Sequence, residues 1–252
     1  AQDASGIAAE LLLAMNEPYD GLYPYIAYRE GKRYRRELVK TELNKSQAPV
    51  LKAHGTYLIL GGTGGIGFEL SKWLATRYGA RLILLGSSTL NEDKLAQLDF
   101  LNRIGGGASY LEADLRDVGQ TLQRVKEHVE HSGEIDGVIH SAADVENSLI
   151  TKMTPEIYHR VVGIQASSCM LMKEMHLELG VNNFIICSSA SSFFGSQGGA
   201  NYSASNCLKD TFSTILAHKY PVHVRLINWG LWGQVGLGKD YDKVLQQKFR
   251  SV

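Results

Sequence analysis

The sequence predicts an α/β fold in which a doubly wound parallel sheet is covered by helices on both faces. From Tyr57 onward, short runs of Val, Ile and Leu alternate with amphipathic stretches of helical period. The apolar runs are continuous, as expected for parallel strands that are buried on both faces. A glycine-rich segment joins the first of these runs to the helical stretch after it, and folds of this kind bind ligands at the carboxyl ends of their strands.

The N-terminal residues differ in pattern from the rest of the chain. Ala8–Met15 is a short apolar helical stretch, and Tyr25–Leu38 indicates two strands joined at Glu30–Gly31. A charged linker that contains proline follows at about Lys40–Ala53. We therefore expect a small unit over residues 1–53 and a doubly wound domain over residues 54–252.

The apolar runs predict the strands of the sheet. They are Tyr57–Leu60, Leu82–Leu85, Ser109–Leu111, Gly137–His140, Phe184–Cys187 and Val222–Ile227. The first helix is expected over Ile66–Tyr78, and its apolar face would carry Ile66, Leu70, Trp73 and Leu74. Gly79 is typical of the residue that ends a helix. Thr154–Pro155 predicts the start of another helix, with a hydroxyl cap before a first-turn proline.

Charge and composition exclude several classes of partner. Lys+Arg and Asp+Glu both total 26, so nothing in the net charge favours nucleic acid or an anionic membrane. No apolar run approaches the ~20 residues that span a bilayer. The chain lacks both an initiator methionine and a signal peptide, and we expect a cytoplasmic segment of a longer protein.

No metal site is expected from the cysteines or the histidines. Cys169, Cys187 and Cys207 are odd in number and show no metal-ligand spacing. We interpret them as free thiols in a reducing compartment that are buried as small apolar side chains. The eight histidines form no pair with helical metal-ligand spacing in a plausible site.

The segment Leu60-Gly-Gly-Thr-Gly-Gly-Ile-Gly67 predicts a phosphate-binding loop. Glycines let the backbone turn tightly and approach a pyrophosphate, while the following helix presents free N–H groups and its positive dipole end. The alternative is a glycine-rich turn that only packs the helix on the sheet. The expected cofactor-binding residues are Gly61, Gly62, Thr63, Gly64, Gly65, Ile66 and Gly67.

Other strand ends are expected to line the same cofactor. Ser87 follows the second strand, where neither a cation for a 2′-phosphate nor an acid for a ribose diol is present. Asp114 follows the third strand and would meet the adenine ring, or else cap the next helix. His140 ends the fourth strand, and with Ser141 and Ala142 it would form part of the pocket wall.

A serine and a tyrosine form the second candidate cluster. Ser189 closes the fifth strand, and Tyr202 stands thirteen residues later at the head of a helix, with Asn206 one turn beyond. A phenol in this place could pass a proton to a carbonyl oxygen while the serine hydroxyl hydrogen-bonds the same oxygen. By themselves the pair could equally be a structural serine and a core tyrosine.

Taken together, these motifs resemble the ketoreductase domain of modular type I polyketide synthases, within the short-chain dehydrogenase/reductase superfamily. The resemblance covers about residues 20–252. Its motifs are Gly61–Gly67, His140–Ala143, Ser188–Ser192, Tyr202–Asn206 and Ile227–Gly233. Most short-chain reductases have lysine where Asn206 stands. Tyr25–Leu38 is similar to the tail of the structural subdomain that precedes such catalytic halves, and Ile227–Gly233 is similar to synthases with a separate acyltransferase.

The resemblance implies a Rossmann-like fold and a definite reaction. In that family NADPH reduces a β-ketoacyl group, carried on an acyl carrier protein, to the β-hydroxy form. Ser189, Tyr202 and Asn206 would be catalytic residues. The acyl carrier protein and the neighbouring domains of the synthase would be the partners.

The sequence departs from this family at the positions of two cations. Family members with the Asn206 pattern take their lysine from the preceding helix, and counting twenty-four residues back from Ser189 gives Gln165. An amide supplies neither the charge nor the field of an ammonium group. Lys173 lies ~12 Å further along the helix, and Lys209 is expected to face solvent.

The second missing cation is the arginine for the 2′-phosphate, which would lie near Ser87. Leu60 also replaces the threonine that usually opens the loop. Neither stereochemical marker of the family is met, because Val145–Asn147 replaces Leu-Asp-Asp and Phe194 replaces tryptophan. Glu146 is interpreted as a solvated loop acid.

Three hypotheses follow from these departures. The leading one is a ketoreductase-like domain that is impaired in reduction, binds NADPH weakly or not at all, and is kept for a structural or docking role. The second is an active NADPH- or NADH-dependent β-ketoacyl reductase in which Gln165 hydrogen-bonds the ribose. The third is an epimerase that enolises the α-carbon through Tyr202.

Overall fold

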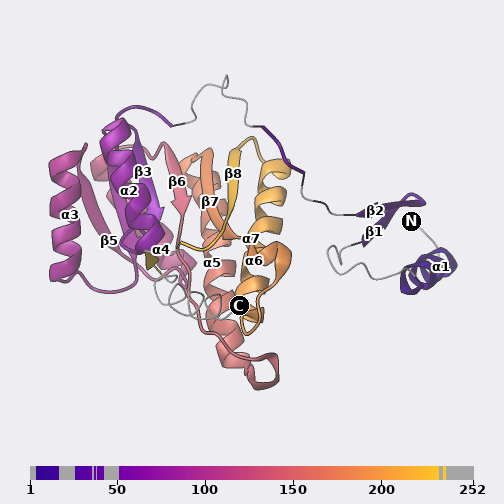
Figure 1. The fold of residues 1–252 in the computed structure, drawn as a ribbon. Coiled ribbons are helices and arrows are strands. Elements are labelled where there is room, and N and C mark those ends of the chain that lie inside the picture. The colour runs from indigo at the N-terminus through magenta and orange to yellow at the C-terminus, as the bar shows by residue number, and fades with distance from the viewer. Residues whose placement is uncertain are drawn as a thin grey trace. The chain divides into compact units, whose positions relative to one another are not determined.

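The computed structural model describes residues 4–16, 26–35, 37, 39–42, 51–232 and 235–236. Two compact units make up the chain, Ala1–Ala48 and Pro49–Val252 (Figure 1). Part of the linker predicted at Lys40–Ala53 lies outside the described residues.

The first unit contains a helix and a hairpin. Helix α1 spans Ala4–Met15, which begins earlier than the pattern predicted. Strands β1 (Ile26–Arg29) and β2 (Lys32–Arg35) pair antiparallel, as the sequence predicted. Glu30 and Gly31 join them with φ of 52° and 70°, the left-handed conformation that two-residue hairpin turns favour.

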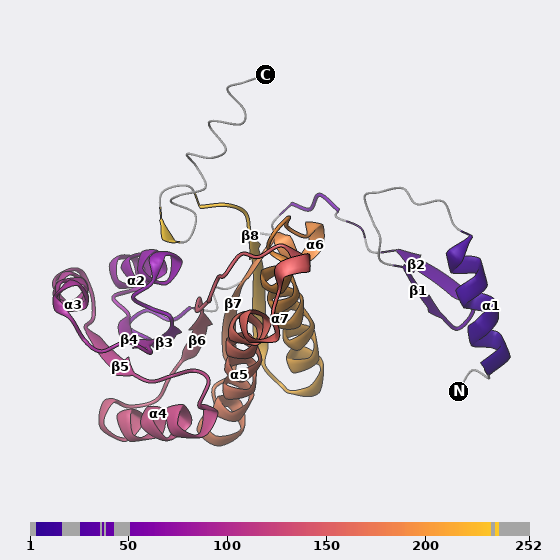
Figure 2. The same ribbon diagram turned by 90° about the horizontal axis from the view of Figure 1, so that it is seen from below.

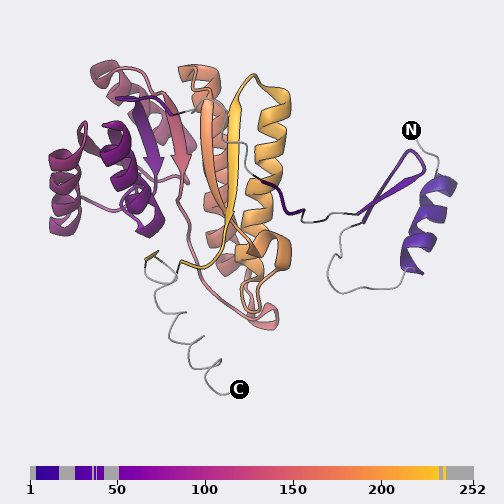
Figure 3. The same cartoon turned by 45° about the horizontal axis from the view of Figure 1, so that its top comes forward.

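The second unit is built on a six-stranded parallel sheet of order β5-β4-β3-β6-β7-β8. Its strands are β3 (Thr56–Leu60), β4 (Arg81–Gly86), β5 (Ala108–Glu112), β6 (Gly137–His140), β7 (Asn183–Ser189) and β8 (His223–Trp229). The strands run in one direction, so their carboxyl ends share one edge of the sheet (Figure 3). The strand order reverses between β3 and β6, and such a switch point opens a ligand crevice. The predicted Rossmann-like fold class is confirmed.

Helices cover the sheet from both sides. On one face lie α2 (Gly65–Tyr78) and α3 (Glu92–Ile104); on the other lie α4 (Val118–Ser132), α5 (Pro155–Leu179) and α7 (Ala200–Lys219) (Figure 2). Two short helices, η1 (Ile150–Lys152) and α6 (Ser191–Phe194), lie in the connections. Each face has its own apolar core, one under α2 and α3 and the other under α4, α5 and α7.

Local sequence signals predicted two helix ends correctly, but the predicted apolar face of α2 was partly wrong. Thr154 caps α5 by accepting a hydrogen bond from the Ile157 N–H, and Gly79 ends α2 with φ of 57°. Trp73, predicted to lie on the apolar face of α2, is 49% exposed and packs edge-on against Tyr78. That prediction was wrong because α2 approaches the sheet through a face that includes the small residues Gly67, Ser71 and Ala75, which leaves no room for an indole.

Among the described residues, no helix combines the length and the apolar character needed to cross a membrane.

Candidate functional site

The glycine loop packs against Ser141 and Ala142, the residues that follow β6. The Gly61 N–H donates to the Leu85 carbonyl at 2.8 Å, and Gly61 has φ of +77°. A Cβ at Gly61 would lie 2.8 Å from Ala142 Cα, and one at Gly67 would lie 2.2 Å from the Gly61 oxygen. The Ser141 hydroxyl donates to the Leu60 carbonyl at 2.9 Å, which ties the two strand ends together.

The start of α2 fits an anion. Its N-cap is Gly64, so no side chain occupies the N–H groups of the first turn. The residues around it line an open hollow: Thr63, Gly64, Gly65, Phe68, Glu69, Gln97, Val235 and Gly236. Backbone without Cβ atoms, a helix N-terminus that no side chain caps and an adjacent hollow together suit the pyrophosphate of a dinucleotide.

Asp114 follows β5 and is held by the next turn. Its carboxylate accepts from the Arg116 N–H at 3.0 Å and lies 3.5 Å from the Arg116 guanidinium. Helix α4 is capped by Asp117 instead, whose side chain accepts from the Gln120 N–H at 2.9 Å. The interpretation of Asp114 as the helix cap is therefore wrong, and its carboxylate stands at the strand end.

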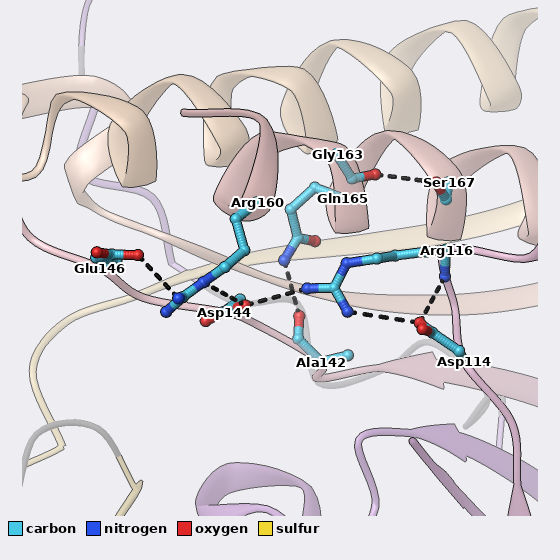
Figure 4. Close-up of polar contacts among 9 residues, drawn as sticks. All are labelled: Asp114, Arg116, Ala142, Asp144, Glu146, Arg160, Gly163, Gln165 and Ser167. Atoms are coloured by element: carbon cyan, nitrogen blue, oxygen red, sulfur yellow. Dashed lines mark hydrogen bonds and ion pairs between the residues drawn. The ribbon is translucent and has the colours of Figure 1, made fainter. Parts of the chain in front are cut away.

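A chain of ion pairs joins the loop after β5, the loop after β6 and helix α5 beside this position (Figure 4). Arg116 lies 3.1 Å from Asp144, Arg160 lies 3.3 Å from the same carboxylate, and Arg160 also lies 3.0 Å from Glu146. Glu146, interpreted as a solvated loop acid, is partly exposed and pairs with Arg160. These side chains are partly exposed, so each pair contributes little energy, and their common effect is to hold the loop after β6 against α5.

Ser189 and Tyr202 lie at the same end of the packed pair of β7 and α7. Ser189 is the last residue of β7, and Tyr202 is in the first turn of α7. The Ser188 hydroxyl lies 3.4 Å from the Asn206 side-chain oxygen, so this turn of α7 packs against the strand end. The Asn206 amide in turn donates to the Tyr202 carbonyl at 2.8 Å.

Asp210, which the sequence did not single out, organises the backbone around Ser189. Its carboxylate accepts from the Ser188 and Ser192 hydroxyls, both at 2.6 Å, and from the Asn228 amide at 3.0 Å. One side chain thus joins β7, α6 and β8 to α7. An acid in mid-helix carries no sequence signal for this role, because its partners come from three other elements.

Gln165 is a buried, neutral side chain beside the residues that follow β6. It is 1% exposed, its amide nitrogen donates to the Ala142 carbonyl at 3.0 Å (Figure 4), and its amide oxygen is buried with no hydrogen-bond partner among the described residues. The Ser168 hydroxyl links the Gln165 carbonyl, at 3.1 Å, to the His140 ring, at 2.6 Å. Complete burial lowers the pKa of His140 to about 3, so its imidazole is neutral.

Lys209 was expected to face solvent, and that expectation was wrong. It is 3% exposed, and its ammonium donates to the Cys187 carbonyl at 2.7 Å. It shares one face of α7 with Tyr202 and Asn206, at helical spacing. Burial lowers the pKa of Lys209 to about 8. The ammonium is therefore bound to the backbone of β7 and, among the described residues, to none of the candidate catalytic side chains.

The cysteines around this ammonium are free thiols, as predicted. Cys169 and Cys187 are buried, and burial raises the pKa of both thiols, that of Cys169 to about 12. Cys207 is only partly buried. Among the described residues, no group of three metal-binding side chains comes together.

A glycine loop at the switch point of a parallel sheet, with a serine and a tyrosine at adjoining strand and helix ends, is the arrangement of the short-chain dehydrogenase/reductase class. The sequence model of the KR domain family matches residues 55–234. The chain therefore belongs to the KR, or ketoreductase, domain family of polyketide synthases.

Relatives and solved structures agree with this assignment. The chain is 30% identical to polyketide synthase ThaG of Burkholderia thailandensis over 83% of its length, and 31% identical to polyketide synthase PksM of Bacillus subtilis over 84%. It spans only 4% and 5% of those two proteins. A ketoreductase domain from the bacillaene assembly line superposes with a TM-score of 0.75 at 29% identity, covering 88% of this chain and 55% of that one.

Proposed function

We propose that this chain is a polyketide synthase ketoreductase domain that binds NADPH but is impaired in the reduction of a β-ketoacyl thioester. The observation that carries the proposal is Gln165, a buried neutral amide at the position where family members have a lysine. The acyl group would be presented by an acyl carrier protein of the same synthase. Neighbouring domains would be the other partners, which fits the small share of its relatives that the chain spans.

The loop, the serine and the tyrosine described above would supply the other parts of the reaction machinery. The N–H groups at the start of α2 and the loop Gly61–Gly67 would hold the pyrophosphate. The cofactor, when bound, supplies a hydride. Tyr202 would give its phenolic proton to the substrate carbonyl oxygen, and the Ser189 hydroxyl would donate a hydrogen bond to that oxygen. Asp210 and Asn206 hold the segments that carry these two groups.

Neither of the two candidate lysines, Lys173 and Lys209, takes over from the missing one. The Lys209 ammonium donates to the Cys187 carbonyl, and the Lys173 ammonium pairs with Glu174 at 3.0 Å. Neither ammonium is therefore available for the charged hydrogen bond that the family's lysine would make to the cofactor ribose. A charge-assisted hydrogen bond contributes roughly 1.5–3 kcal/mol, which corresponds to a rate about ten- to a hundredfold lower.

One observation favours the alternative of an active reductase. The buried Gln165 oxygen has no partner among the described residues, and a buried acceptor without a donor is costly. A ribose hydroxyl of the bound cofactor could donate to it. This contact would restore part of the orientation that the lysine supplies, but not its charge.

The substitution Gln165→Lys distinguishes the two functions. We expect wild type to reduce a β-ketoacyl thioester with NADPH slowly, and Gln165→Lys to raise kcat about ten- to a hundredfold because it restores the ammonium. The measurement is steady-state NADPH oxidation with product analysis. The control is the double variant with Tyr202→Phe, in which the gain should disappear. Rapid turnover by wild type that Gln165→Lys does not increase would show that the domain is an ordinary active reductase.

A further inference from the structure

A second buried lysine lies beside the cofactor loops. Lys94 is on α3 and is 8% exposed. Its ammonium contacts the Ser88 carbonyl at 2.5 Å, the Ser88 hydroxyl at 2.7 Å, the Thr89 carbonyl at 2.7 Å and the Tyr110 hydroxyl at 3.0 Å. Within the described part of the chain, no carboxylate oxygen lies within 4.0 Å of it. A buried charge without a counter-charge costs free energy, which an anionic ligand can offset.

The position of this ammonium is that of the cofactor's adenosine end. Ser88 and Thr89 follow β4, the neighbour of β3 and its glycine loop, and the strand end at this place meets the ribose of a dinucleotide. Helix α3 also reaches the glycine loop, since the Gln97 amide donates to the Thr63 carbonyl at 3.4 Å. The Gln97 side-chain oxygen is buried and has no hydrogen-bond partner among the described residues. One helix therefore shapes both loops that would enclose the adenosine.

The chemistry of Ser88 makes it a donor toward solvent. A hydroxyl that accepts a hydrogen bond from an ammonium keeps its own hydrogen for another acceptor. Ser88 is exposed, whereas Lys94 behind it is buried. An outward hydroxyl backed by a fixed positive charge suits a phosphate, because a hydrogen bond to an ionised acceptor is about twice as strong as one between neutral groups.

We infer that Ser88 and Lys94 recognise the 2′-phosphate of NADPH, Ser88 by contact and Lys94 through its charge and its hold on the loop. The inference rests on the proposed function for the presence of a cofactor. It assigns the cation that the sequence lacks at Ser87 to a residue seven positions later, on the next helix. Lys94 is a positioning residue here, since its four acceptors already occupy its hydrogens. The domain therefore selects NADPH over NADH.

The test compares two ligands that differ only in the 2′-phosphate. Binding of adenosine 2′,5′-bisphosphate and of 5′-AMP is measured by calorimetry on the whole chain. We expect wild type to bind the bisphosphate at least about tenfold more tightly. Lys94→Met should lower that ratio about tenfold while 5′-AMP binding changes less than about twofold. Tyr110→Phe, which removes one acceptor and keeps the charge, should retain the ratio.

Ser88→Ala keeps the test decisive if Lys94→Met fails to fold, because Ser88 is exposed; it should lower the ratio about threefold or more. A wild-type ratio near one, or equal weakening of both ligands by Lys94→Met, overturns the inference and leaves the proposed function intact. If neither ligand binds, the chain has no functional cofactor site, and both the proposed function and the present inference are overturned. If wild type binds the bisphosphate selectively and turns over rapidly, and Gln165→Lys does not raise kcat, the inference is supported. The proposal that reduction is impaired is then overturned.

Discussion

Replacing Gly67 with alanine is expected to abolish binding of adenosine 2′,5′-bisphosphate and to destabilise the domain by about 3 kcal/mol or more. The added Cβ would lie 2.2 Å from the Gly61 carbonyl oxygen and 2.5 Å from the Ser141 hydroxyl. The carbonyl belongs to the loop backbone and cannot rotate away as a side chain can. The helix N-terminus would therefore have to leave the position that fits the pyrophosphate.

The measurement is thermal or denaturant unfolding together with calorimetric binding. Gly163→Ala is the matched control, because Gly163 lies within α5 and a Cβ there would meet no atom within 4 Å. Alanine at this helical position should stabilise the domain slightly. Wild-type stability and binding in Gly67→Ala would show that the loop has room for a side chain and is not a close-fitting cradle.

Replacing Lys209 with methionine is expected to stabilise the domain at pH 7 by about 2 kcal/mol. Burial lowers the pKa of Lys209 from 10.5 to about 8, which corresponds to roughly 3 kcal/mol of lost stability while the group is charged in both states. Methionine of similar length removes that cost and forfeits about 1 kcal/mol from the hydrogen bond to the Cys187 carbonyl.

The same substitution should change how stability depends on pH. Below pH 8, Lys209 is protonated in the folded and unfolded chains, so wild type bears the full cost. Between pH 8 and about 10.5 the folded chain releases this proton while the unfolded chain keeps it. The unfolded chain then binds more protons, and the free energy of unfolding contributed by this group rises with pH. The advantage of Lys209→Met should therefore shrink across this interval.

The measurement is denaturant unfolding of wild type and variant at pH 7, 8, 9 and 10. The difference between their free energies of unfolding at each pH is compared, because groups common to both chains then cancel. Lys219→Met, at an exposed lysine at the end of the same helix, is the control and should change stability by less than about 0.5 kcal/mol at each pH. A Lys209→Met variant that is less stable than wild type at pH 7 would mean that the ammonium stabilises the domain.

The fold could be predicted because its signals are local. Continuous apolar runs indicate strands buried on both faces, and the caps at Thr154 and Gly79 act through neighbouring backbone groups. The hairpin at Glu30–Gly31 depends on its turn residues alone. The face of α2 was harder to predict, because the exposure of Trp73 depends on how closely Gly67 and Ser71 let the helix approach the sheet.

Some residues of the candidate site could be recognised from the sequence, and others only from the folded structure. Gly61–Gly67, Ser189 and Tyr202 could be selected because spacing along the chain reflects the chemistry they would perform. The partners of Glu146 and Asp210 could not, since they come from other elements that only the folded chain brings within hydrogen-bond reach. A retrospective signal exists for Lys94, which occurs at i, i+4 and i+7 spacing with Leu98 and Leu101 on the buried face of α3.

The sequence by itself therefore determined the doubly wound sheet, the glycine loop and the family, and it predicts Gln165 at the position where the family pattern has a lysine. Only the tertiary structure decided where the cations lie. Lys209 and Lys94 are helical lysines that nothing in the sequence distinguishes from exposed ones. Whether such a side chain is exposed or buried depends on which face of the helix packs against the sheet. The packing buries both, one against the backbone of β7 and the other behind Ser88, because each ammonium finds backbone carbonyls there to replace its water.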